Sequence, residues 1–574
     1  MKTLLEYLKP FLPRMSYGFI IKVSATLAEL FLPYILTHIL ENVIKRQSVK
    51  LIVYWGILMI ICSATACILN IVANRMAATV SRDYSLKVRH ILFEKTLHLS
   101  AAQTDKFTVA SLESRITNDT YNIHHFVTVM QRMGVRSPIM LIGGVIITLI
   151  MDSYLSLVMI ATIPIIFTCI YLISRKGIPL YSKVQKSIDN MVRVVREDTQ
   201  GIRVIKALSK EEYEHNRFNK VNTTLIKDEM SAGIVMGSVH PVMNLFMNMG
   251  IVAVIAISAA RVTDNLSSPE TVIAFIQYFT QISMSLMVLS RVFTMASKSI
   301  ASAKRIEEVL LCEEELPVFS FHEYKPNYNG NVIEFSKVNF SYNGKKEDLS
   351  DINFSLKQGQ TLGIIGATGS GKSTLVKLLL RFYDVSSGAI YINGEDIRTI
   401  EKNKLYSYFG TVMQNDFLYN DTINENIRFG RDISDKDIKF AAKIAQADSF
   451  INNFADKYEH ILSQKGTNIS GGQKQRLLIA RAIAKKTKFL IFDDSSSALD
   501  YKTDLILRQA INENFKDTIV INIAQRVSTV KNCSLILVLD EGKIIAKGRH
   551  DELLATCKEY KEISDSQMGG AIID

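Results

Sequence analysis

The 574-residue chain has few of the residues that cross-link or punctuate a fold: 6 cysteines, 10 prolines and 1 tryptophan. The cysteines have neither the paired spacing of a zinc site nor the pattern of a disulfide framework. The sequence therefore excludes a zinc module and a disulfide-rich secreted domain. We expect the cysteines to be small buried hydrophobic residues in a reducing compartment.

The N-terminus lacks the features of a secretory leader. Its apolar core is short, is interrupted by Glu6 and Lys9, and has no small-residue cleavage site. Its apolar side chains are spaced along one side of a helix, which predicts a short helix on the membrane surface; they are Leu4, Leu5, Leu8, Phe11 and Leu12.

Acidic residues are in deficit, with 56 Asp and Glu against 67 Lys and Arg, which gives a net charge of +11. A basic chain can bind nucleic acid, but here the positive charge flanks long apolar runs, so we expect membrane lipid and no nucleic acid as the partner. A bilayer-spanning helix needs roughly 20 residues, and six segments are candidates: Tyr17–Leu40, Leu51–Ala73, Ser137–Met151, Tyr154–Ile173, Val235–Ala259 and Val272–Phe293. The third is short and has to borrow residues from the helix before it.

The distribution of basic residues predicts the orientation of these spans. Residues 74–136 and 174–230 are long, polar and rich in Lys and Arg, whereas the opposite side has short loops. The positive-inside rule therefore places both long stretches and both termini in the cytosol of a multi-pass cell-membrane protein. Three basic residues in Lys45–Lys50 weaken this orientation without reversing it. Helical periodicity continues through the cytosolic stretches, which predicts that the membrane helices extend beyond the bilayer.

The pattern changes at Glu313–Asn331, where acidic residues, prolines and turn signals interrupt the helical period. Short β-rich runs then alternate with helices, and the runs are Val332–Tyr342, Thr361–Ile365, Ala389–Ile392, Phe489–Phe492, Thr518–Ile523 and Leu535–Leu539. We therefore expect an α-helical transmembrane domain at 1–312, a linker at 313–331 and an α/β P-loop domain at 332–574.

The stretch GATGSGKS follows one of these strands and precedes a helix-like run, which is the context of a P-loop. Backbone N–H groups of such a loop surround polyphosphate oxygens, and the helix N-terminus adds a favourable dipole. Lys372 would reach the β- and γ-phosphates of a nucleotide, and the Ser373 hydroxyl would bind Mg²⁺. The predicted nucleotide contacts here are Gly366, Ala367, Thr368, Gly369, Ser370, Gly371, Lys372, Ser373 and Thr374.

Three further motifs accompany the P-loop: NISGGQKQR at Asn468–Arg476, FLIFDDSSSALD at Phe489–Asp500 and VMQNDFLYNDTINENI at Val412–Ile427. With this set the chain resembles the ATP-binding cassette family, and most of all the bacterial exporters that fuse a six-span membrane domain to the cassette. The resemblance implies ATP and Mg²⁺ as ligands and a helical subdomain within the cassette. It also implies coupling segments near Phe107–Arg115 and Gln200–Leu208.

Other site residues follow from the resemblance together with their chemistry. Tyr342 would present its ring to adenine, and Gln414 and Asp493 would join Ser373 around Mg²⁺. The signature motif is Ser470, Gly471, Gly472 and Gln473, and in the family it faces the γ-phosphate of a partner's ATP across a dimer interface. Asp500, in the loop after Asp493, would contact the opposite site.

Two positions depart from the family pattern. Asp494 stands where the family has its catalytic Glu, and Gln525 stands where it has a switch His. An Asp withdraws the carboxylate by about 1.5 Å, and misplacement of roughly 1 Å costs a base on the order of 100-fold in rate. Gln525 hydrogen-bonds phosphate but carries no positive charge. The pair predicts a site that holds ATP and hydrolyses it slowly.

This asymmetry predicts a heterodimer, because the chain would offer a weak base to its own ATP and a sound signature to its partner's. It resembles the degenerate-site subunit of bacterial heterodimeric multidrug exporters, whose second half-transporter has the intact Glu and His. Possible substrate contacts are Glu29 in the first span, where an ionisable group is costly, and three polar residues on one face of the fifth span, His240, Asn244 and Asn248. Hydrophobic small molecules fit a cavity lined by the nearby methionines.

Several alternatives remain open from the sequence. Lipid or peptide export would give the same pattern, and so would a gated channel or regulatory subunit on this scaffold. A soluble P-loop ATPase acting on nucleic acid has only the basic pI in its favour. An importer is disfavoured, because importers keep membrane and cassette domains on separate chains.

Overall fold

The structure is a computed structural model, and it describes residues 2–263, 268–313, 316–319, 330–495 and 498–568. The chain divides into two compact units. The first comprises Met1–His98 and Phe107–Cys312, and the second comprises Leu99–Lys106 and Glu313–Asp574.

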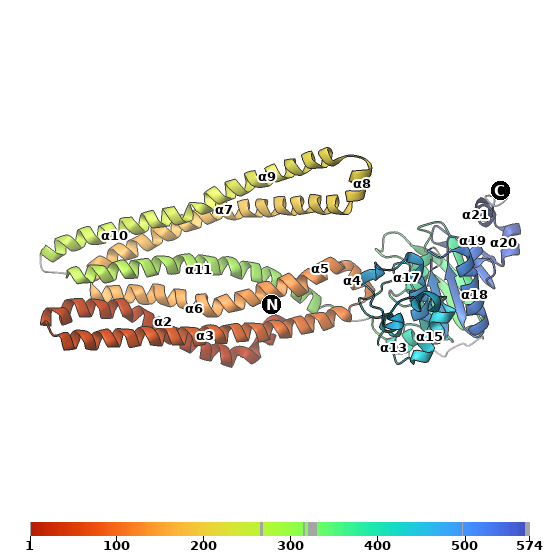
Figure 1. Ribbon diagram of the computed structural model, residues 1–574, viewed down its shortest axis with the longest axis horizontal. Coiled ribbons are helices and arrows are strands. Elements are labelled where there is room, and N and C mark those ends of the chain that lie inside the picture. Colours follow the sequence, from red (N-terminus) through yellow and green to blue (C-terminus); the bar gives the residue numbers. More distant parts are fainter. Residues whose placement is uncertain (1, 264–267, 314–315, 320–329, 496–497, 569–574) are drawn as a thin grey trace. The chain divides into compact units, whose positions relative to one another are not determined.

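The first unit is built of long helices (Figure 1): α2 (Leu12–His38), α3 (Val49–Leu97), α6 (Thr120–Met151), α7 (Ser153–Gln200), α9 (Glu211–Gly237), α10 (Val239–Thr263) and α11 (Pro269–Leu310). The described residues contain six helical stretches long and apolar enough to cross a membrane, which confirms the predicted six-span class. The short third segment does borrow residues, because α6 begins at Thr120. Helices α3 and α7 contain 49 and 48 residues, more than twice the length that a bilayer requires.

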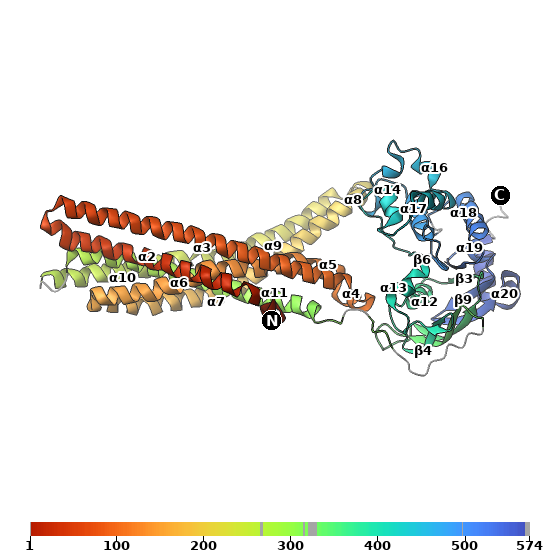
Figure 2. The same cartoon turned by 90° about the horizontal axis from the view of Figure 1, so that it is seen from below.

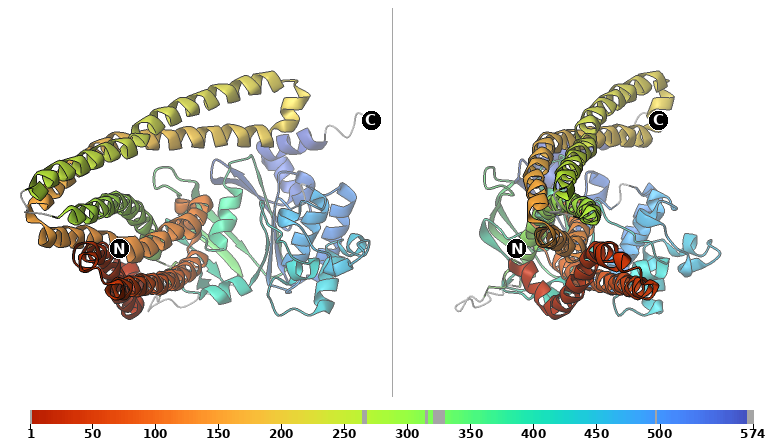
Figure 3. Two further views of the ribbon diagram at one scale, coloured as in Figure 1. Left: turned by 60° about the vertical axis from the view of Figure 1, so that its left-hand side comes forward. Right: turned by 90° about the vertical axis from the view of Figure 1, so that its left-hand side faces the viewer.

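Close packing holds α2, α6 and α11 together, and the end-on view in Figure 3 shows these helices side by side. Gly144 of α6 lies so close to α11 that a Cβ there would meet Ile282 Cδ1 at 2.9 Å. Tyr278 of α11 is fully buried, and its hydroxyl donates to the Leu30 carbonyl of α2 at 2.6 Å. The first half of α7 also packs against α6 and α11, and α7 is joined to α9 through the short helix α8 (Ile202–Ala207), as Figure 1 shows.

The N-terminal residues differ in part from the predicted surface helix. Helix α1 (Lys2–Leu8) buries Leu4 against α3, where the Tyr84 hydroxyl donates to the Leu4 carbonyl at 3.0 Å. Leu5 and Leu12 are exposed. The five apolar side chains therefore do not form one exposed face, because α3 covers part of the helix.

The second unit contains two sheets. A six-stranded sheet has the order β10 (Lys543–Gly548), β9 (Leu535–Asp540), β3 (Thr361–Gly366), β8 (Ile519–Ile523), β7 (Phe489–Asp493) and β6 (Phe409–Val412). The neighbours from β9 to β6 are parallel, and β10 pairs antiparallel with β9. The smaller antiparallel sheet has the order β2 (Leu349–Leu356), β1 (Ile333–Phe340), β4 (Ser387–Ile392) and β5 (Glu395–Asp396). Strands β2, β5 and β10 were not expected from the sequence.

Helices complete this unit, as Figure 2 shows: α12 (Lys372–Leu379) follows β3, and a helical lobe contains α14 (Ile423–Arg428), α15 (Asp435–Ile444), α16 (Asp448–Ile451) and α17 (Gly471–Ile483). Ile438, Ala441 and Leu477 of the lobe belong to a buried core that also includes Val412 of β6 and Leu490 of β7. An α/β domain with a helical subdomain was the expected fold, and it is confirmed. At the far end of the chain lie α18 (Tyr501–Asn514), α19 (Val527–Val530), α20 (His550–Thr556) and α21 (Lys558–Met568).

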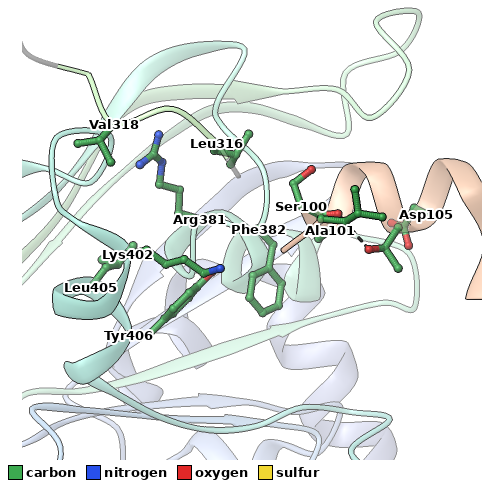
Figure 4. Close-up of a pocket in the computed structure, with 12 residues that line it drawn as sticks. Ser100, Ala101, Asp105, Leu316, Val318, Arg381, Phe382, Lys402, Leu405 and Tyr406 are labelled. Atoms are coloured by element: carbon green, nitrogen blue, oxygen red, sulfur yellow. Dashed lines mark hydrogen bonds between the residues drawn. The ribbon is translucent and has the colours of Figure 1, made fainter. Parts of the chain in front are cut away.

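One element of the second unit comes from the first half of the chain. Helix α4 (Ala101–Phe107) packs against Arg381 and Phe382 around a pocket of about 350 Å³, shown in Figure 4. The Asp105 carboxylate accepts a hydrogen bond from the Tyr383 hydroxyl. Phe107, the first residue of the predicted coupling segment Phe107–Arg115, is the last residue of α4, and residues Val109–Ser114 form α5 of the first unit.

Candidate nucleotide site

Most of the predicted nucleotide-binding residues line one cavity of about 190 Å³ where the parallel strands β3, β6, β7 and β8 end. The carboxyl edge of a parallel sheet is where α/β domains bind ligands. The predicted residues on its wall are Thr368, Gly369, Gly371, Lys372, Ser373, Thr374, Gln414, Asp493, Asp494 and Gln525. Asp348 lies there too and was missed by sequence reasoning, because no local motif identifies it.

The loop between β3 and α12 has the backbone that a phosphate cradle requires. Gly371 has φ +99°, which favours glycine, and a Cβ there would meet Leu349 Cδ2 at 2.7 Å. At Gly366 a Cβ would lie 2.2 Å from the Leu539 carbonyl oxygen, so only glycine fits between β3 and β9. A Cβ on Gly369 would meet nothing within 4 Å, so this residue faces open space.

Two polar side chains of the loop fit a phosphate ligand. Lys372 is 8 % exposed, and its Nζ donates to the carbonyls of Gly366 at 2.9 Å and Ala367 at 2.7 Å. Burial lowers the Lys372 pKa, while Asp493 and Asp494 oppose that shift. The buried Ser370 hydroxyl has no hydrogen-bond partner among the described residues. A polyphosphate would give the lysine a stronger acceptor than the two carbonyls.

The three predicted Mg²⁺ ligands lie on the same cavity wall and offer oxygen donors, which Mg²⁺ prefers. They are a hydroxyl, an amide and a carboxylate, from Ser373, Gln414 and Asp493. Asp493 closes β7 and is 2 % exposed. Burial raises the pKa of this carboxyl, and a hydrogen bond from Ser373 opposes the shift. Bound Mg²⁺ would supply the counter-charge that burial removes.

Asp494, the predicted degenerate base, directly follows β7. Its backbone is left-handed, with φ +52°, and its N–H donates to the Ile523 carbonyl at 2.9 Å. Burial raises the pKa of its carboxyl, and Lys372 and Arg526 lower it. The carboxyl group therefore faces the cavity in a setting that weakens its charged form.

Gln525, the predicted degenerate switch residue, lies just after β8 and is exposed. A second glutamine, Gln567 of α21, bridges this segment. Its Nε2 donates to the Gln525 carbonyl at 2.8 Å, and its Oε1 accepts from the Val527 N–H at 2.8 Å. Sequence reasoning missed Gln567, because the contact joins residues 42 apart along the chain.

Tyr342 lies two residues beyond the end of β1, and its side chain is 39 % exposed. Its hydroxyl donates to Thr374 Oγ1 at 3.3 Å, which places the ring beside the P-loop helix. The edge-on ring of Tyr383 lies 5.1 Å away, and Lys377 Nζ lies 5.5 Å from the ring centre. An exposed, supported aromatic ring next to the phosphate loop is suited to stack on a base.

The signature residues lie at the start of α17 and do not line the cavity. Ser470 caps this helix: its Oγ accepts from the Gln473 N–H at 3.2 Å, and its own N–H donates to Gln473 Oε1 at 3.0 Å. Gly471 is exposed, and Gly472 carries no side chain, so the capped helix end has an accessible surface. Asp500 caps α18 by accepting from the Thr503 N–H at 2.9 Å.

The predicted substrate residues of the membrane unit fall into two places. Glu29 of α2 forms an ion pair with Arg136 of α6 at 2.9 Å and lines a pocket between α2, α3 and α6. His240, Asn244 and Asn248 lie on α10, are all exposed, and do not line that pocket.

Two protein-family models match this chain. The model described as the ABC transporter transmembrane region matches residues 15–286, and the model described as ABC transporter matches residues 349–497. The chain is 34 % identical over 571 residues to the ABC transporter ATP-binding protein YfiB of Bacillus subtilis (strain 168), and 99 % of each chain is covered. The chain belongs to the ABC transporter family.

Other matches agree. The ABC transporter ATP-binding protein Rv1273c of Mycobacterium tuberculosis (strain ATCC 25618 / H37Rv) is 30 % identical over 573 residues, covering 99 % of this chain and 98 % of the relative. The solved structure of a bacterial Atm1-family ABC exporter with ATP bound superimposes with a TM-score of 0.80 at 22 % identity, covering 98 % and 99 % of the two chains. That likeness shows the shared fold.

The predicted family is therefore confirmed, with the half-transporter architecture of one membrane domain and one cassette. This ABC transporter is a multi-pass membrane protein with a cytoplasmic nucleotide-binding domain, and that domain is an ABC-type ATPase.

Proposed function

We propose that this ABC transporter chain is one subunit of a heterodimeric exporter, that it holds ATP in a weakened site, and that the exporter moves hydrophobic or amphipathic compounds of the multidrug type out of the cell. One observation carries the proposal. A cavity with Lys372, Ser373 and Asp493 in place has Asp494 and Gln525 where the family has Glu and His.

In this proposal the P-loop from Gly366 to Thr374 holds the phosphates and Tyr342 stacks on adenine. Ser373, Gln414 and Asp493 hold Mg²⁺, which offsets phosphate charge. Asp494 is the degenerate base. A base has to be deprotonated and within about 3 Å of the proton it takes. The short side chain of Asp494 works against the second condition.

The signature end of α17 has the opposite role. Its capping box leaves the first N–H groups of a 13-residue helix directed outward, where the helix dipole favours an anion. We assign Ser470, Gly471, Gly472 and Gln473 to the γ-phosphate of a partner's ATP, and Asp500 to the contact between the two cassettes. The second subunit would supply the Glu and His that this chain lacks.

The test measures ATP turnover of the purified chain alone and mixed with a second half-transporter from the same membrane. Alone, turnover should be slow and little changed by Asp494→Asn, because the carboxylate is already misplaced. The mixture should hydrolyse ATP briskly, respond to a hydrophobic substrate, and drive uphill transport in vesicles. Brisk turnover by the isolated chain that disappears in Asp494→Asn would overturn the proposal.

A further inference from the structure

A polar pocket of about 580 Å³ lies among the apolar spans of the membrane unit, between α2, α3 and α6. These three helices contact one another in pairs and run side by side in Figures 1 and 2. Its polar lining consists of Lys22, Glu29, Asn70, Asn74, Arg132 and Arg136. Polar groups at this depth are costly and mark functional sites in membrane proteins.

The pocket lies in the cytoplasmic half of the membrane unit. With the cassette in the cytoplasm, the outer ends of these helical stretches are at Arg46, Val49 and Met151, because the helix that contains α2 continues to Arg46. At 1.5 Å rise per residue, Glu29 is about 26 Å from its outer end and Asn74 about 38 Å. A hydrocarbon core is about 30 Å thick. The polar groups therefore lie toward the cytoplasmic boundary of the bilayer.

The charges in this pocket do not balance. Three cations, Lys22, Arg132 and Arg136, face the single carboxylate of Glu29, which leaves two positive charges in excess. Lys22 is 4 % exposed, although it lies within an apolar span. Arg132 and Arg136 are exposed, so a ligand can reach them. The excess positive charge around the pocket favours an additional anion.

The acceptors that belong to the protein are already engaged. Lys22 Nζ donates to Asn70 Oδ1 at 2.6 Å and to Asn74 Oδ1 at 3.2 Å. Glu29 accepts from Asn70 Nδ2 at 2.7 Å and from Arg136 Nε at 3.0 Å.

Arg132 is the cation with the most spare donors. Its Nε donates to Asn74 Oδ1 at 3.1 Å, and this is its one side-chain hydrogen bond within the described part of the chain. A guanidinium has five donors, so at least four remain for a ligand. The same walls carry the apolar side chains of Leu32, Ile71 and Met133, which suit an alkyl chain.

We propose that this pocket binds an amphiphile with an anionic head group, the head held by Arg132, Arg136 and Lys22 and the tail lying along the apolar wall. The inference rests on the proposed export of amphipathic compounds and narrows their class to anionic ones. The head group is a carboxylate or phosphate, and it belongs either to a lipid of the cytoplasmic leaflet or to a free single-chain compound.

Direct binding tests this without any ATP turnover. The full chain, purified in an uncharged detergent, is titrated with dansylaminoundecanoic acid and, separately, with its uncharged primary amide, and dansyl fluorescence reports binding. The acid should bind about tenfold tighter or better, because one charge-assisted hydrogen bond is worth at least that factor. Equal affinities for acid and amide would overturn the proposal.

A series of charge-changing variants distinguishes loss of ligand binding from loss of the folded structure. Glu29→Gln removes the competing carboxylate and should strengthen binding of the acid, a gain that a misfolded protein cannot produce. Arg132→Gln should weaken it about tenfold, and Arg132→Gln with Arg136→Gln should abolish the preference over the amide. Arg75→Gln is the matched control, since Arg75 is an exposed cation of α3 outside the pocket lining. An equal loss in Arg75→Gln, or no trend along the series, would refute the assignment.

Competition separates the possible sources. Inorganic phosphate at the concentration of the probe should not displace the acid, because it lacks the tail; displacement would contradict an amphiphile site. Displacement by phosphatidylglycerol assigns the site to a leaflet lipid, whereas displacement by dodecyl phosphate alone assigns it to a free amphiphile, and each result supports the proposal. If the acid and the amide bind equally, the pocket proposal fails and the proposal of a slow ATP site stands. If the isolated chain hydrolyses ATP briskly, the proposed function fails and the measured affinities for the acid and the amide do not change. The two failures are therefore distinguishable.

Discussion

In the proposed site, Asp494 is one methylene shorter than the catalytic glutamate of the family, and the backbone around it is fixed. Its N–H is held by the Ile523 carbonyl, and its left-handed φ suits Asp better than Glu. We expect Asp494→Glu with Gln525→His to raise ATP turnover of the isolated chain on the order of 100-fold, because the base returns to contact distance. The strain of Glu in this conformation costs about 1 kcal/mol of stability.

Steady-state ATPase assays check this prediction. Lys372→Ala, which removes the phosphate-binding amine, sets the background in the same assay. A double variant that binds ATP as the original chain does and hydrolyses it no faster would show that the two substitutions are not what slows the site.

Protonation of Asp493 gives a second prediction for a single residue. Burial raises the pKa of this carboxyl above its ordinary value. The protonated form therefore appears at higher pH than for an exposed aspartate, and it favours the folded state as pH falls. Because Mg²⁺ needs the carboxylate, the extra ATP affinity that Mg²⁺ confers should decline as pH is lowered through this raised pKa. Titration of ATP with and without Mg²⁺ across pH measures the effect, and Asp493→Asn should show neither the benefit of Mg²⁺ nor its decline.

Among the elements, α4 is linked to the nucleotide site by two tyrosines. Tyr383 donates to Asp105 of α4, and its ring meets Tyr342, the proposed adenine contact. Tyr383→Phe removes only the hydrogen bond and should cut substrate-stimulated turnover of the assembled transporter about fivefold or more, because a bond to a charged acceptor is lost. Basal turnover and ATP affinity should not change. Tyr383→Leu also removes the ring contact and should weaken ATP binding as well, so equal behaviour of the two variants would contradict this link.

Helix α21 restrains the segment after β8 through Gln567. Its two hydrogen bonds hold the Gln525 carbonyl and the Val527 N–H. We expect Gln567→Ala to speed amide exchange of Val527 by about 30-fold, since two hydrogen bonds of about 1 kcal/mol each are lost. Hydrogen exchange followed by mass spectrometry of peptides covering β8 and α19 measures this. Ser566→Ala, one residue earlier on α21, is the control and should leave exchange unchanged.

The elements that could be predicted are those encoded by short, contiguous stretches of the sequence. The P-loop, the signature and the carboxylate after β7 are contiguous motifs, and each lies where strand and helix order placed it. Contacts made by distant residues were missed, including Gln567 on Gln525 and Asp105 on Tyr383, because nothing in a short window encodes them. Lys22 lies within an apolar run and could have been recognised by the rule that identified Glu29. Its partners on α3, Asn70 and Asn74, could not have been predicted.

In the whole molecule the slow ATP site and the anionic-amphiphile pocket lie in different units, so substitutions at the two sites should have different effects. In the first proposal Asp494 and Gln525 of the cassette set how fast ATP is consumed, and in the second the excess positive charge in the membrane unit sets which compounds bind. Substitutions in the pocket should therefore change substrate affinity and not the basal ATP turnover of the assembled transporter, and substitutions at Asp494 should do the reverse.

The assembled transporter gives the sharpest asymmetry. In a head-to-tail cassette dimer each ATP lies between one chain's P-loop and the other's signature. Ser470→Arg would fill the exposed N-terminal end of α17 and remove donors from the partner's γ-phosphate, so we expect turnover of the mixed complex to fall on the order of 100-fold. Asp494→Asn in the same chain should leave most of the turnover, because the partner's site carries it. ATPase assays of the two mixed complexes, each with an unmodified partner, compare these losses directly. Equal losses would mean that both sites hydrolyse ATP at similar rates, and the division of labour between the two chains would not hold.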